Sequence, residues 1–457
     1  MKRRALLAST ALATAALAGS PVSAADPIKI DVSGFYQFYA LAGAVEGNYA
    51  LNGTSVQYKG LQFIQQGEIY FIGQSKLDNG TTFGIRVQLE GWNPSATATG
   101  AVRTVDEAYL YAFGDWGRIE FGSDDGAPYK MFYGAPSALP GWGFHKRNTN
   151  YDWTNPVAQG FNTAAIRTTG SVIDVEQNKP NHINYFTPRI YGFQLGAVYS
   201  PKVQPRTQPG GIWGLAPGPG ANAGGVCGFP DSTTANACPT NDNSWQDAVA
   251  VGLNYLNRFG ELSVAVYGAY SFMNFVPSLN PVATAYNTIN GANLYNWNQA
   301  VIGLQFNYAG FTVGGNWGWD NMGLGRNGWT GADNDTRTWA AGIMYETGPW
   351  QMSAGFAVAV NDNGNGVPQL ATCLQGTTSA CTQAIAATTT AYFGTNPNTG
   401  SASFGAVTAS TIEFGGSYQL GPGVKAILGG IINNLSGPSN AVTGQSWAAM
   451  LGMDFHF

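Results

Sequence analysis

Residues Gln445 to Phe457 read QSWAAMLGMDFHF, and this stretch decides how the rest of the chain is interpreted. Every second residue in it is apolar: Trp447, Ala449, Leu451, Met453, Phe455 and Phe457. A period of two places these side chains on one face of a β-strand. We therefore expect one face of this strand to lie against an apolar medium. The strand runs up to an aromatic carboxyl-terminal residue.

The amino-terminal segment has the pattern of a secretory signal peptide. Basic residues at positions 2–4 precede an apolar, alanine-rich stretch at 5–18, and small residues follow. This predicts cleavage after Ala24 or Ala25, leaving residues 26–457 as a single domain. The alternative is a retained anchor, but the stretch is short for a spanning helix and no basic residues follow it. An exported chain with this terminal strand is expected to close as a β-barrel in an outer membrane.

The composition supports a barrel. Only 10% of residues are charged, whereas 13% are aromatic, and the mean hydropathy of −0.09 is intermediate. Alternating lipid-facing and water-facing residues produce such a value. No apolar run after residue 25 is long enough for a transmembrane helix. The formal net charge is −5, and removal of the three basic signal residues makes it −8, which argues against a nucleic-acid partner.

The four cysteines form two close pairs, Cys227 with Cys238 and Cys373 with Cys381. Each pair lies in a loop-like segment rich in Gly, Thr and Asn. In an oxidising compartment this spacing predicts two local disulfides. Neither segment contains histidine, so a metal site is the weaker interpretation.

Short turns alternate with long polar segments along the chain. Turn residues occur at 78–80, 115–117, 189–192, 258–260, 309–310, 348–349 and 420–423. The long segments are 123–180, 202–244, 273–295 and 362–409. This asymmetry predicts periplasmic turns and extracellular loops.

Between them we predict sixteen strands, at 28–42, 61–77, 81–92, 102–113, 117–123, 181–187, 192–200, 245–257, 261–272, 297–308, 311–319, 336–347, 350–361, 410–419, 424–433 and 445–457. The predicted fold is all-β, a sixteen-stranded antiparallel transmembrane barrel with both termini periplasmic. A barrel of this size encloses a water-filled channel.

Aromatic residues concentrate near the predicted strand ends. Those on the loop side are Trp245, Tyr295, Trp297, Trp339 and Trp447. Those on the turn side are Tyr185, Tyr255, Tyr308, Tyr345, Tyr418, Phe455 and Phe457. We interpret them as two interfacial girdles. The alternative is the general preference of aromatic residues for strands.

Two segments resemble a known family. WGRIEFGSDD at 116–125 resembles the strand that enters the constriction loop of Gram-negative general porins. NHINYFTP at 181–188, followed by Gly192 and Phe193, resembles the strand that leaves it. With Phe457 as the terminal aromatic residue used in barrel assembly, the resemblance covers essentially the whole mature chain. Low charge and the signal are most similar to porins of alphaproteobacteria.

The resemblance implies an integral outer-membrane protein of a Gram-negative bacterium, a homotrimer surrounded by lipid. Each barrel would pass ions and small hydrophilic solutes by passive diffusion, without a cofactor. The third loop, 123–180, would fold into the barrel and narrow it. Its acidic residues Asp124 and Asp125, with Glu120, would face a basic cluster on the opposite wall and sort solutes by charge.

Strand alternation selects the basic residues that face the lumen. If Phe83, Ile85, Val87 and Leu89 face outward, Arg86 faces inward, and the same argument turns Arg118 and Glu120 inward. Arg103 is a third candidate on a strand whose faces are ambiguous. These arginines either set selectivity or merely neutralise lumen carboxylates such as Glu90 and Glu107. On the third loop, Lys130, Lys146 and Arg147 either line the pore or bind the wall.

No catalytic or metal site is predicted. None of the three histidines, His145, His182 and His456, can be paired with a nucleophile. Acidic residues at 333–335 and 362–366 could bind calcium, but turn composition explains them equally well. Two other functions remain open: a substrate-specific channel, for example for oligosaccharides, and a plugged or adhesive surface barrel.

Overall fold

The structure is a computed structural model of the 457-residue chain. It describes residues 27–48, 56–91, 105–144, 179–202, 244–276, 288–289, 292–293, 295–321, 335–362, 406–436 and 443–457. The predicted signal peptide, all four cysteines, Arg103, His145, Lys146, Arg147, Asp333 and residues 363–366 lie outside the described residues, so the predictions made for them stay predictions.

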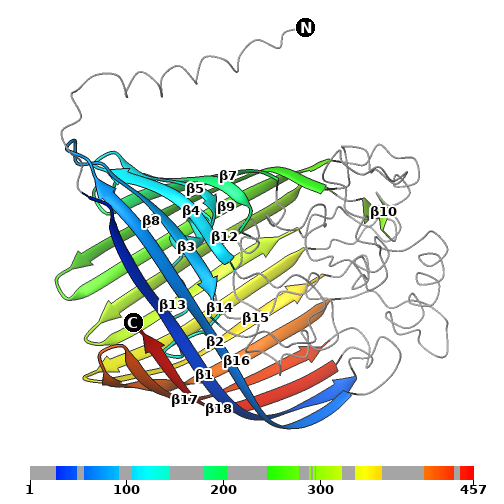
Figure 1. Cartoon of the computed structure of the whole chain (residues 1–457). Coiled ribbons are helices and arrows are strands. Elements are labelled where there is room, and N and C mark those ends of the chain that lie inside the picture. The colour runs from blue at the N-terminus through cyan, green and yellow to red at the C-terminus, as the bar shows by residue number, and fades with distance from the viewer. Residues whose placement is uncertain are drawn as a thin grey trace, which may run out of the picture.

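Sixteen strands of the described chain form one closed antiparallel barrel (Figure 1). They are β1 (Lys29–Asn48), β2 (Val56–Lys76), β3 (Thr82–Glu90), β4 (Val105–Gly114), β5 (Gly117–Ser123), β6 (Asn181–Phe186), β7 (Phe193–Lys202), β8 (Ser244–Phe259), β9 (Leu262–Val276), β12 (Trp297–Tyr308), β13 (Phe311–Asp320), β14 (Thr336–Thr347), β15 (Trp350–Asn361), β16 (Val407–Gly421), β17 (Val424–Ser436) and β18 (Thr443–His456). A separate two-stranded sheet joins β10 (Thr288–Ile289) and β11 (Ala292–Asn293).

The predicted fold is confirmed, and the strand count is the predicted one. Strands β5, β12, β14 and β15 have the predicted bounds. β1 and β2 extend farther toward the loop end than predicted, because polar and glycine residues there still pair across the ladder, as Asn48 does with Thr443. The small β10–β11 sheet was not predicted.

The barrel closes between the first and last strands. Phe35 pairs with His456, and the register continues to Asn48 opposite Thr443. The terminal residue takes part: Gly34 N donates to Phe457 O at 3.0 Å, and Phe457 N donates to Gly34 O at 3.1 Å. Both β1 and β18 therefore have one end among the short turns (Figure 1).

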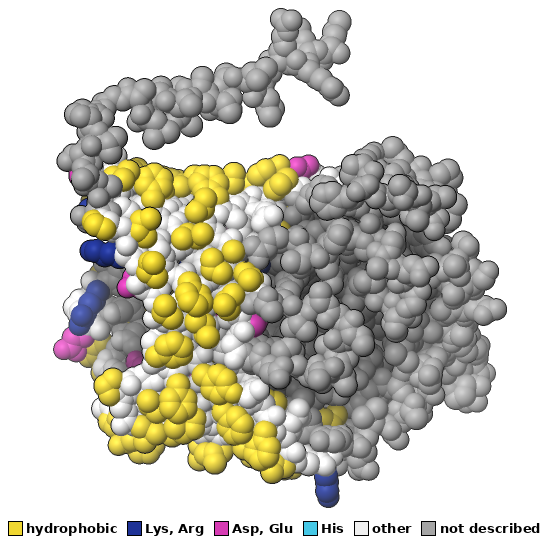
Figure 2. Space-filling view, viewed as in Figure 1, with side chains coloured by type: hydrophobic (Ala, Val, Ile, Leu, Met, Phe, Trp, Pro, Cys, Tyr) yellow, Lys and Arg dark blue, Asp and Glu magenta, His cyan; other side chains and the backbone are white. Residues whose placement is uncertain are grey.

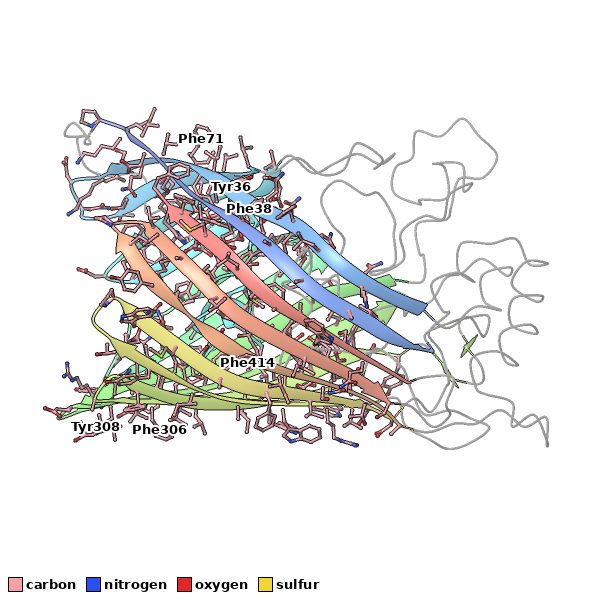
Figure 3. The ribbon with its side chains drawn as sticks, turned by 90° about the horizontal axis from the view of Figure 1, so that it is seen from below. Tyr36, Phe38, Phe71, Phe306, Tyr308 and Phe414 are labelled. Atoms are coloured by element: carbon pink, nitrogen blue, oxygen red, sulfur yellow. The ribbon has the colours of Figure 1, made fainter. Side chains whose placement is uncertain are left out.

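The outer surface of the barrel is apolar. In β18, Trp447, Leu451 and Phe455 are exposed, whereas their neighbours Ser446 and Met450 are buried. Apolar side chains are spread over the face of the described strands that Figure 2 shows. Phe71, Phe306 and Tyr308 project from this surface (Figure 3). Such an inverted distribution suits a lipid environment.

One predicted girdle residue is placed differently. Trp297 is only 4% exposed, and its indole Nε1 donates to Asp320 Oδ1 at 2.6 Å. Alternation along β12 turns Trp297, Gln299 and Val301 inward together, so its position near a strand end did not reveal its face. Trp339 and Trp447 do point outward. In the described part of the chain, no helix is long and apolar enough to cross a membrane.

Candidate permeation site

The third loop begins with a short helix seated on the inner wall. Helix α2 (Ala127–Lys130) follows β5 and places Ala127 and Met131 in a buried cluster with residues of β6, β7, β8, β9 and β12. Tyr267 Oη donates to Pro128 O at 2.8 Å, and Asn254 Nδ2 donates to Met131 O at 3.1 Å. Gly196 of β7 makes room, because a Cβ there would lie 2.3 Å from the Met131 sulfur.

Next the loop crosses β12 and β13. Gln305 Nε2 donates to Gly134 O at 2.6 Å, and Asn316 Oδ1 accepts from Ala135 N at 3.3 Å. At Gly303 the approach is closest, since a Cβ would lie 1.9 Å from Tyr133 O. Wall side chains thus satisfy backbone groups that the loop buries.

The loop then reaches β15, β16 and β1. Glu413, which is 1% exposed, accepts from Ser137 Oγ at 2.5 Å and from Gly143 N at 2.7 Å. Ser353 Oγ accepts from Ala138 N at 2.8 Å. Tyr39 Oη donates to Pro140 O at 2.5 Å, and its ring meets Trp142 edge-on. These bonds hold residues 127–144 along one side of the lumen.

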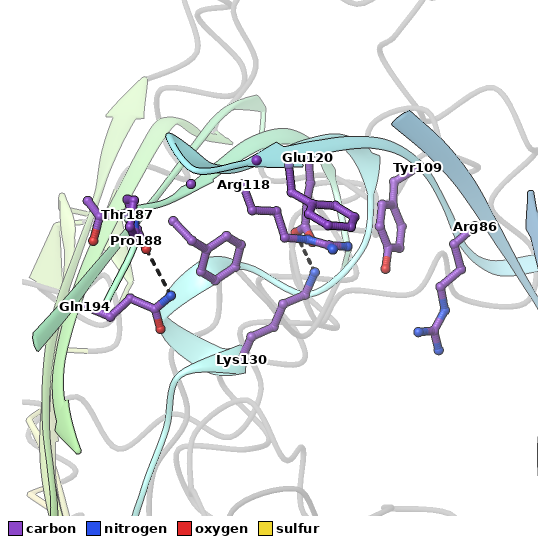
Figure 4. A pocket seen from close by; sticks show the side chains of 12 residues that line it. Arg86, Tyr109, Arg118, Glu120, Lys130, Thr187, Pro188 and Gln194 are labelled. Carbon is purple, nitrogen blue, oxygen red and sulfur yellow. Dashed lines mark hydrogen bonds and ion pairs between the residues drawn. The ribbon is translucent and has the colours of Figure 1, made fainter. Parts of the chain in front are cut away.

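Next to helix α2, the wall formed by β2–β5 borders a pocket of about 540 Å³, which Lys130 of the helix and residues of β6 and β7 also line (Figure 4). Its lining includes three basic and three aromatic side chains: Arg86, Arg118, Lys130, Tyr109, Phe113 and Phe186. Alternation along β3, β4 and β5 turns these strand residues inward, as predicted for the two arginines. The pocket lies toward the turn end of these strands, since Gly114 and Gly117 of the β4–β5 turn also line it.

Each basic group lies over an aromatic ring. Arg86 Cζ is 4.2 Å from the centre of the Tyr70 ring, and Arg118 Cζ is 4.6 Å from the centre of the Tyr111 ring. Lys130 Nζ is 5.0 Å from the Tyr109 ring centre. Tyr109 lies between Lys130 and Arg86, which is opposite Tyr109 in the strand register (Figure 4). Aromatic faces stabilise cations and leave the edges of a guanidinium available.

Two of the predicted acidic residues, Glu120 and Asp124, form ion pairs with Arg118 and Lys130. Glu120 is 2% exposed and forms ion pairs with Arg118 Nε and Lys130 Nζ, each at 2.6 Å. Asp124 is 0% exposed, with Lys130 Nζ at 2.5 Å and His182 Nε2 at 2.7 Å. Asp124 Oδ1 can only accept, so we place the His182 proton on Nε2.

This arrangement differs from the expected one. Asp124 and Glu120 share a wall with Arg118 and do not face it across the lumen. The physical reason is proximity. Arg118 and Glu120 lie two residues apart on the same face of β5, and the side chain of Lys130 reaches back to the carboxylates of Glu120 and Asp124, where the third loop begins. Asp125 is half-buried next to this root, and its carbonyl accepts from Asn184 Nδ2 at 2.9 Å.

The charges at the loop root stabilise each other. Burial alone lowers the pKa of Lys130, but the carboxylates of Asp124 and Glu120 raise it above its ordinary value. Burial alone raises the pKa of Asp124, but the hydrogen bond from His182 and the charge of Lys130 bring it below its ordinary value. Lys130 is therefore held charged between two carboxylates.

Arg86 is less neutralised than the other two cations. Among the residues that the structure describes, no carboxylate forms an ion pair with it. Its hydrogen bond from Nη2 to Gln88 Oε1 is long, at 3.4 Å. Its Nε is buried and has no hydrogen-bond partner within the described part of the chain.

Asn184 was not predicted as a site residue, although it lies in the segment 181–188 that resembles a porin strand. This buried amide accepts from Ala127 N at 2.8 Å and donates to Glu120 Oε2 at 3.0 Å, which joins α2 to β5 and β6. The inward position of Asn184 in the alternating segment 181–186 was the available signal. The contacts of Tyr109 and Tyr111 with the cations were not predicted either.

The far end of the third loop is fixed by Lys179. Its Nζ contacts Asp106 Oδ2 and lies 3.0 Å from Glu107 Oε1, and Ser123 Oγ donates to its carbonyl at 2.5 Å. Burial alone lowers the pKa of Lys179, but Asp125, Glu107 and Asp106 raise it above its ordinary value. Within the described ranges, no group of three or more His, Cys, Asp or Glu side chains is placed to hold a metal ion.

Comparison with known proteins gives the family. A family model described as Gram-negative porin matches residues 5–366. An uncharacterized protein of Rickettsia conorii is 23% identical over 382 residues, covering 77% of this chain and 85% of the relative. The outer membrane channel DcaP of Acinetobacter baumannii has a TM-score of 0.53 at 10% identity, covering 94% of this chain and 97% of that one. The anion-selective porin from Comamonas acidovorans has a TM-score of 0.48 at 15% identity, covering 94% and 100%.

The family match spans well over half of the chain, and the barrel that it implies is the one described above. The chain belongs to the Gram-negative porin family, and it is accordingly an integral outer-membrane channel and not an enzyme.

Proposed function

We propose that this porin is a passive diffusion channel for ions and small hydrophilic solutes, which pass between the third loop and the wall formed by β2–β5. One observation supports this path above all others. Beyond helix α2, hydrogen bonds tie the described loop to β8, β12, β15 and β16, whereas the pocket that Arg86 and Arg118 line lies beside the helix, at the β2–β5 wall.

We propose further that the basic wall controls selectivity and favours anions. Arg118 and Lys130 keep partial exposure, with 35% and 25% of their side chains accessible, whereas Glu120 and Asp124 are buried beneath them. A passing ion therefore meets cationic groups first. In this proposal, Glu120 and Asp124 hold Arg118 and Lys130 in position on the wall and do not form an acidic side of a transverse field.

The assembly is proposed to be a homotrimer, as in the general porins that the sequence resembles. The mass of the detergent-solubilised protein, measured by light scattering and corrected for detergent, tests this proposal. Three chains per particle would support it, and a single chain would contradict it.

The channel itself is tested by reconstitution. In planar bilayers bathed in potassium chloride we expect stepwise, ohmic conductance increases, and liposomes containing the protein should swell in small sugars faster than in large ones. A barrel that inserts, shown by its heat-modifiable migration, but neither conducts nor swells liposomes would contradict the proposal and favour a plugged barrel.

A further inference from the structure

We propose that the pocket on the β2–β5 wall is a binding subsite for small carboxylates that carry an aromatic or other apolar body. The inference rests on the proposed function and deepens it, because it names a class of solute that the channel retains on its way through. Three features of the pocket support it: the guanidinium of Arg86, which pairs with no described carboxylate; two further cations, of Arg118 and Lys130; and apolar side chains in the lining.

Arg86 supplies the anchor. Tyr70 covers one face of its guanidinium at 4.2 Å, and among the described residues no carboxylate pairs with it. Arg86 lines the pocket, so a carboxylate that enters can pair with the guanidinium. Planar guanidinium edges match carboxylates in a bidentate manner, with charge-assisted bonds stronger than neutral ones.

Arg118 and Lys130 add positive charge to the same cavity. Both line the pocket with Arg86, and both are held in place from below by Glu120. Glu120 also lines the pocket, but it is buried and accepts from both cations, so its negative charge is largely neutralised. Three cations set against two buried carboxylates, Glu120 and Asp124, leave a net positive charge that favours an anionic ligand.

The apolar part of the pocket distinguishes this ligand from a simple inorganic anion. Phe113 and Phe186 line the cavity next to Pro188, and Phe113 remains exposed although it faces the lumen. Phe113 stacks on Tyr111 at 6.2 Å between ring centres, which continues the aromatic surface along β4. Chloride gains nothing from such a surface, whereas the ring of an aromatic acid buries apolar area against it.

The volume suits this class of solute. At about 540 Å³ the cavity falls within the range of roughly 300–1,000 Å³ that is common for small-molecule sites. It lies toward the turn end of β4 and β5, so a carboxylate bound there would occupy the periplasmic part of the path.

The experiment measures block of the potassium chloride current through single channels by three probes: benzoate, acetate and the neutral benzyl alcohol. We expect benzoate to halve the current at a concentration roughly tenfold below that of acetate, because ring burial adds to the ion pair. Benzyl alcohol, which lacks the carboxylate, should have no effect in this range.

Matched variants locate the effect. Arg86→Gln should raise the half-blocking benzoate concentration by roughly tenfold. Phe113→Ala should weaken block by benzoate but not by acetate. The control is Lys425→Gln on β17, which removes a positive charge whose Nζ lies 3.2 Å from Gln351 Oε1, away from the pocket. It should leave block unchanged, and heat-modifiable migration of each variant confirms its insertion.

The outcomes separate the two proposals. Normal conductance with equal block by benzoate and acetate would overturn this inference and leave the diffusion channel standing. Weakening by Lys425→Gln as large as that by Arg86→Gln would also overturn it, since general lumen charge would then be the cause. A barrel without conductance would contradict the proposed function and this inference with it.

Discussion

At the scale of single residues, Lys130 neutralises two buried carboxylates at the root of the third loop. Its Nζ lies 2.6 Å from Glu120 and 2.5 Å from Asp124, and Asn184 joins the same group. Removal of the lysine would leave two buried negative charges side by side, a defect much more costly than loss of an exposed ion pair.

Lys130→Met should therefore destabilise the barrel by about 3–5 kcal/mol. The free energy of unfolding in lipid vesicles, measured by urea titration, tests this value. Lys425→Gln serves as the control, because Lys425 bonds to an uncharged amide and its loss should cost little. Equal stabilities of the two variants would contradict the role given to Lys130.

The pH dependence of this group follows from its two pKa shifts. The pKa of Asp124 is below its ordinary value of 3.8, so its contribution to stability is complete above pH 3.8 and is lost as the pH falls further. The pKa of Lys130 is above its ordinary value of 10.5, so its contribution is complete below pH 10.5 and is lost at higher pH. In Lys130→Met the buried carboxylates lose the charge that lowers the pKa of Asp124, so they take up protons at higher pH than in the wild type. The stability difference between wild type and variant should therefore shrink as the pH falls from neutral. A difference that grows as the pH falls would contradict the assignment.

At the scale of elements, the third loop is held by wall residues that are far apart in the sequence. Gln305, Asn316, Ser353 and Glu413 come from four different strands, and each bonds to the loop backbone or to a loop hydroxyl. Glu413 makes two such bonds, to Ser137 and to Gly143, on either side of residues 138–142, which we call the tip. It is therefore the residue whose loss should free the tip most.

Glu413→Gln should increase the noise of the open-channel current and lower the voltage at which channels close. The amide keeps the shape of the side chain but turns one acceptor into a donor facing Ser137 or Gly143, at a cost of about 1–3 kcal/mol. Ser417→Ala, on the same strand, is the control, since Ser417 bonds to Gln351 of the wall and not to the loop. Indistinguishable noise in the two variants would show that Glu413 does not hold the tip.

The sequence predicted where this loop starts and returns, but not its course. Residues Ser123 and Asn181 were identified because strand alternation stops and resumes there. The course depends on spaces such as the one at Gly303 and on single donors spread over distant strands. No local pattern records such pairings, and for the same reason the contacts of Asp124 with Lys130 and His182 were not predicted.

At the scale of the whole molecule, the barrel is recognisable from sequence because one rule operates in every strand. Alternation sets the face of each side chain, and turn residues set the strand ends, so β12, β14 and β15 could be bounded to the residue. Trp297 shows where this reasoning fails, since a girdle position along the strand axis does not specify the face.

The lipid-facing surface gives a direct test of the inverted architecture. Leu304 of β12 is exposed on the outer face at mid-strand. Leu304→Arg should destabilise the barrel by about 2–4 kcal/mol, because a charge is then placed in the hydrocarbon region. Leu304→Phe should be nearly neutral, and urea titration in vesicles compares the two. An arginine variant as stable as the phenylalanine variant would place Leu304 outside the hydrocarbon region.

If solutes pass along the cationic β2–β5 wall, that wall sets the permeability of anions relative to cations. The reversal potential under a potassium chloride gradient measures this ratio directly. We predict an anion-selective potential for the wild type and a shift toward cations in Arg86→Gln/Arg118→Gln, with Lys425→Gln close to wild type. A wild-type channel that is cation-selective, or a double variant that keeps the wild-type potential, would contradict the claim and place the selective part of the path elsewhere in the barrel.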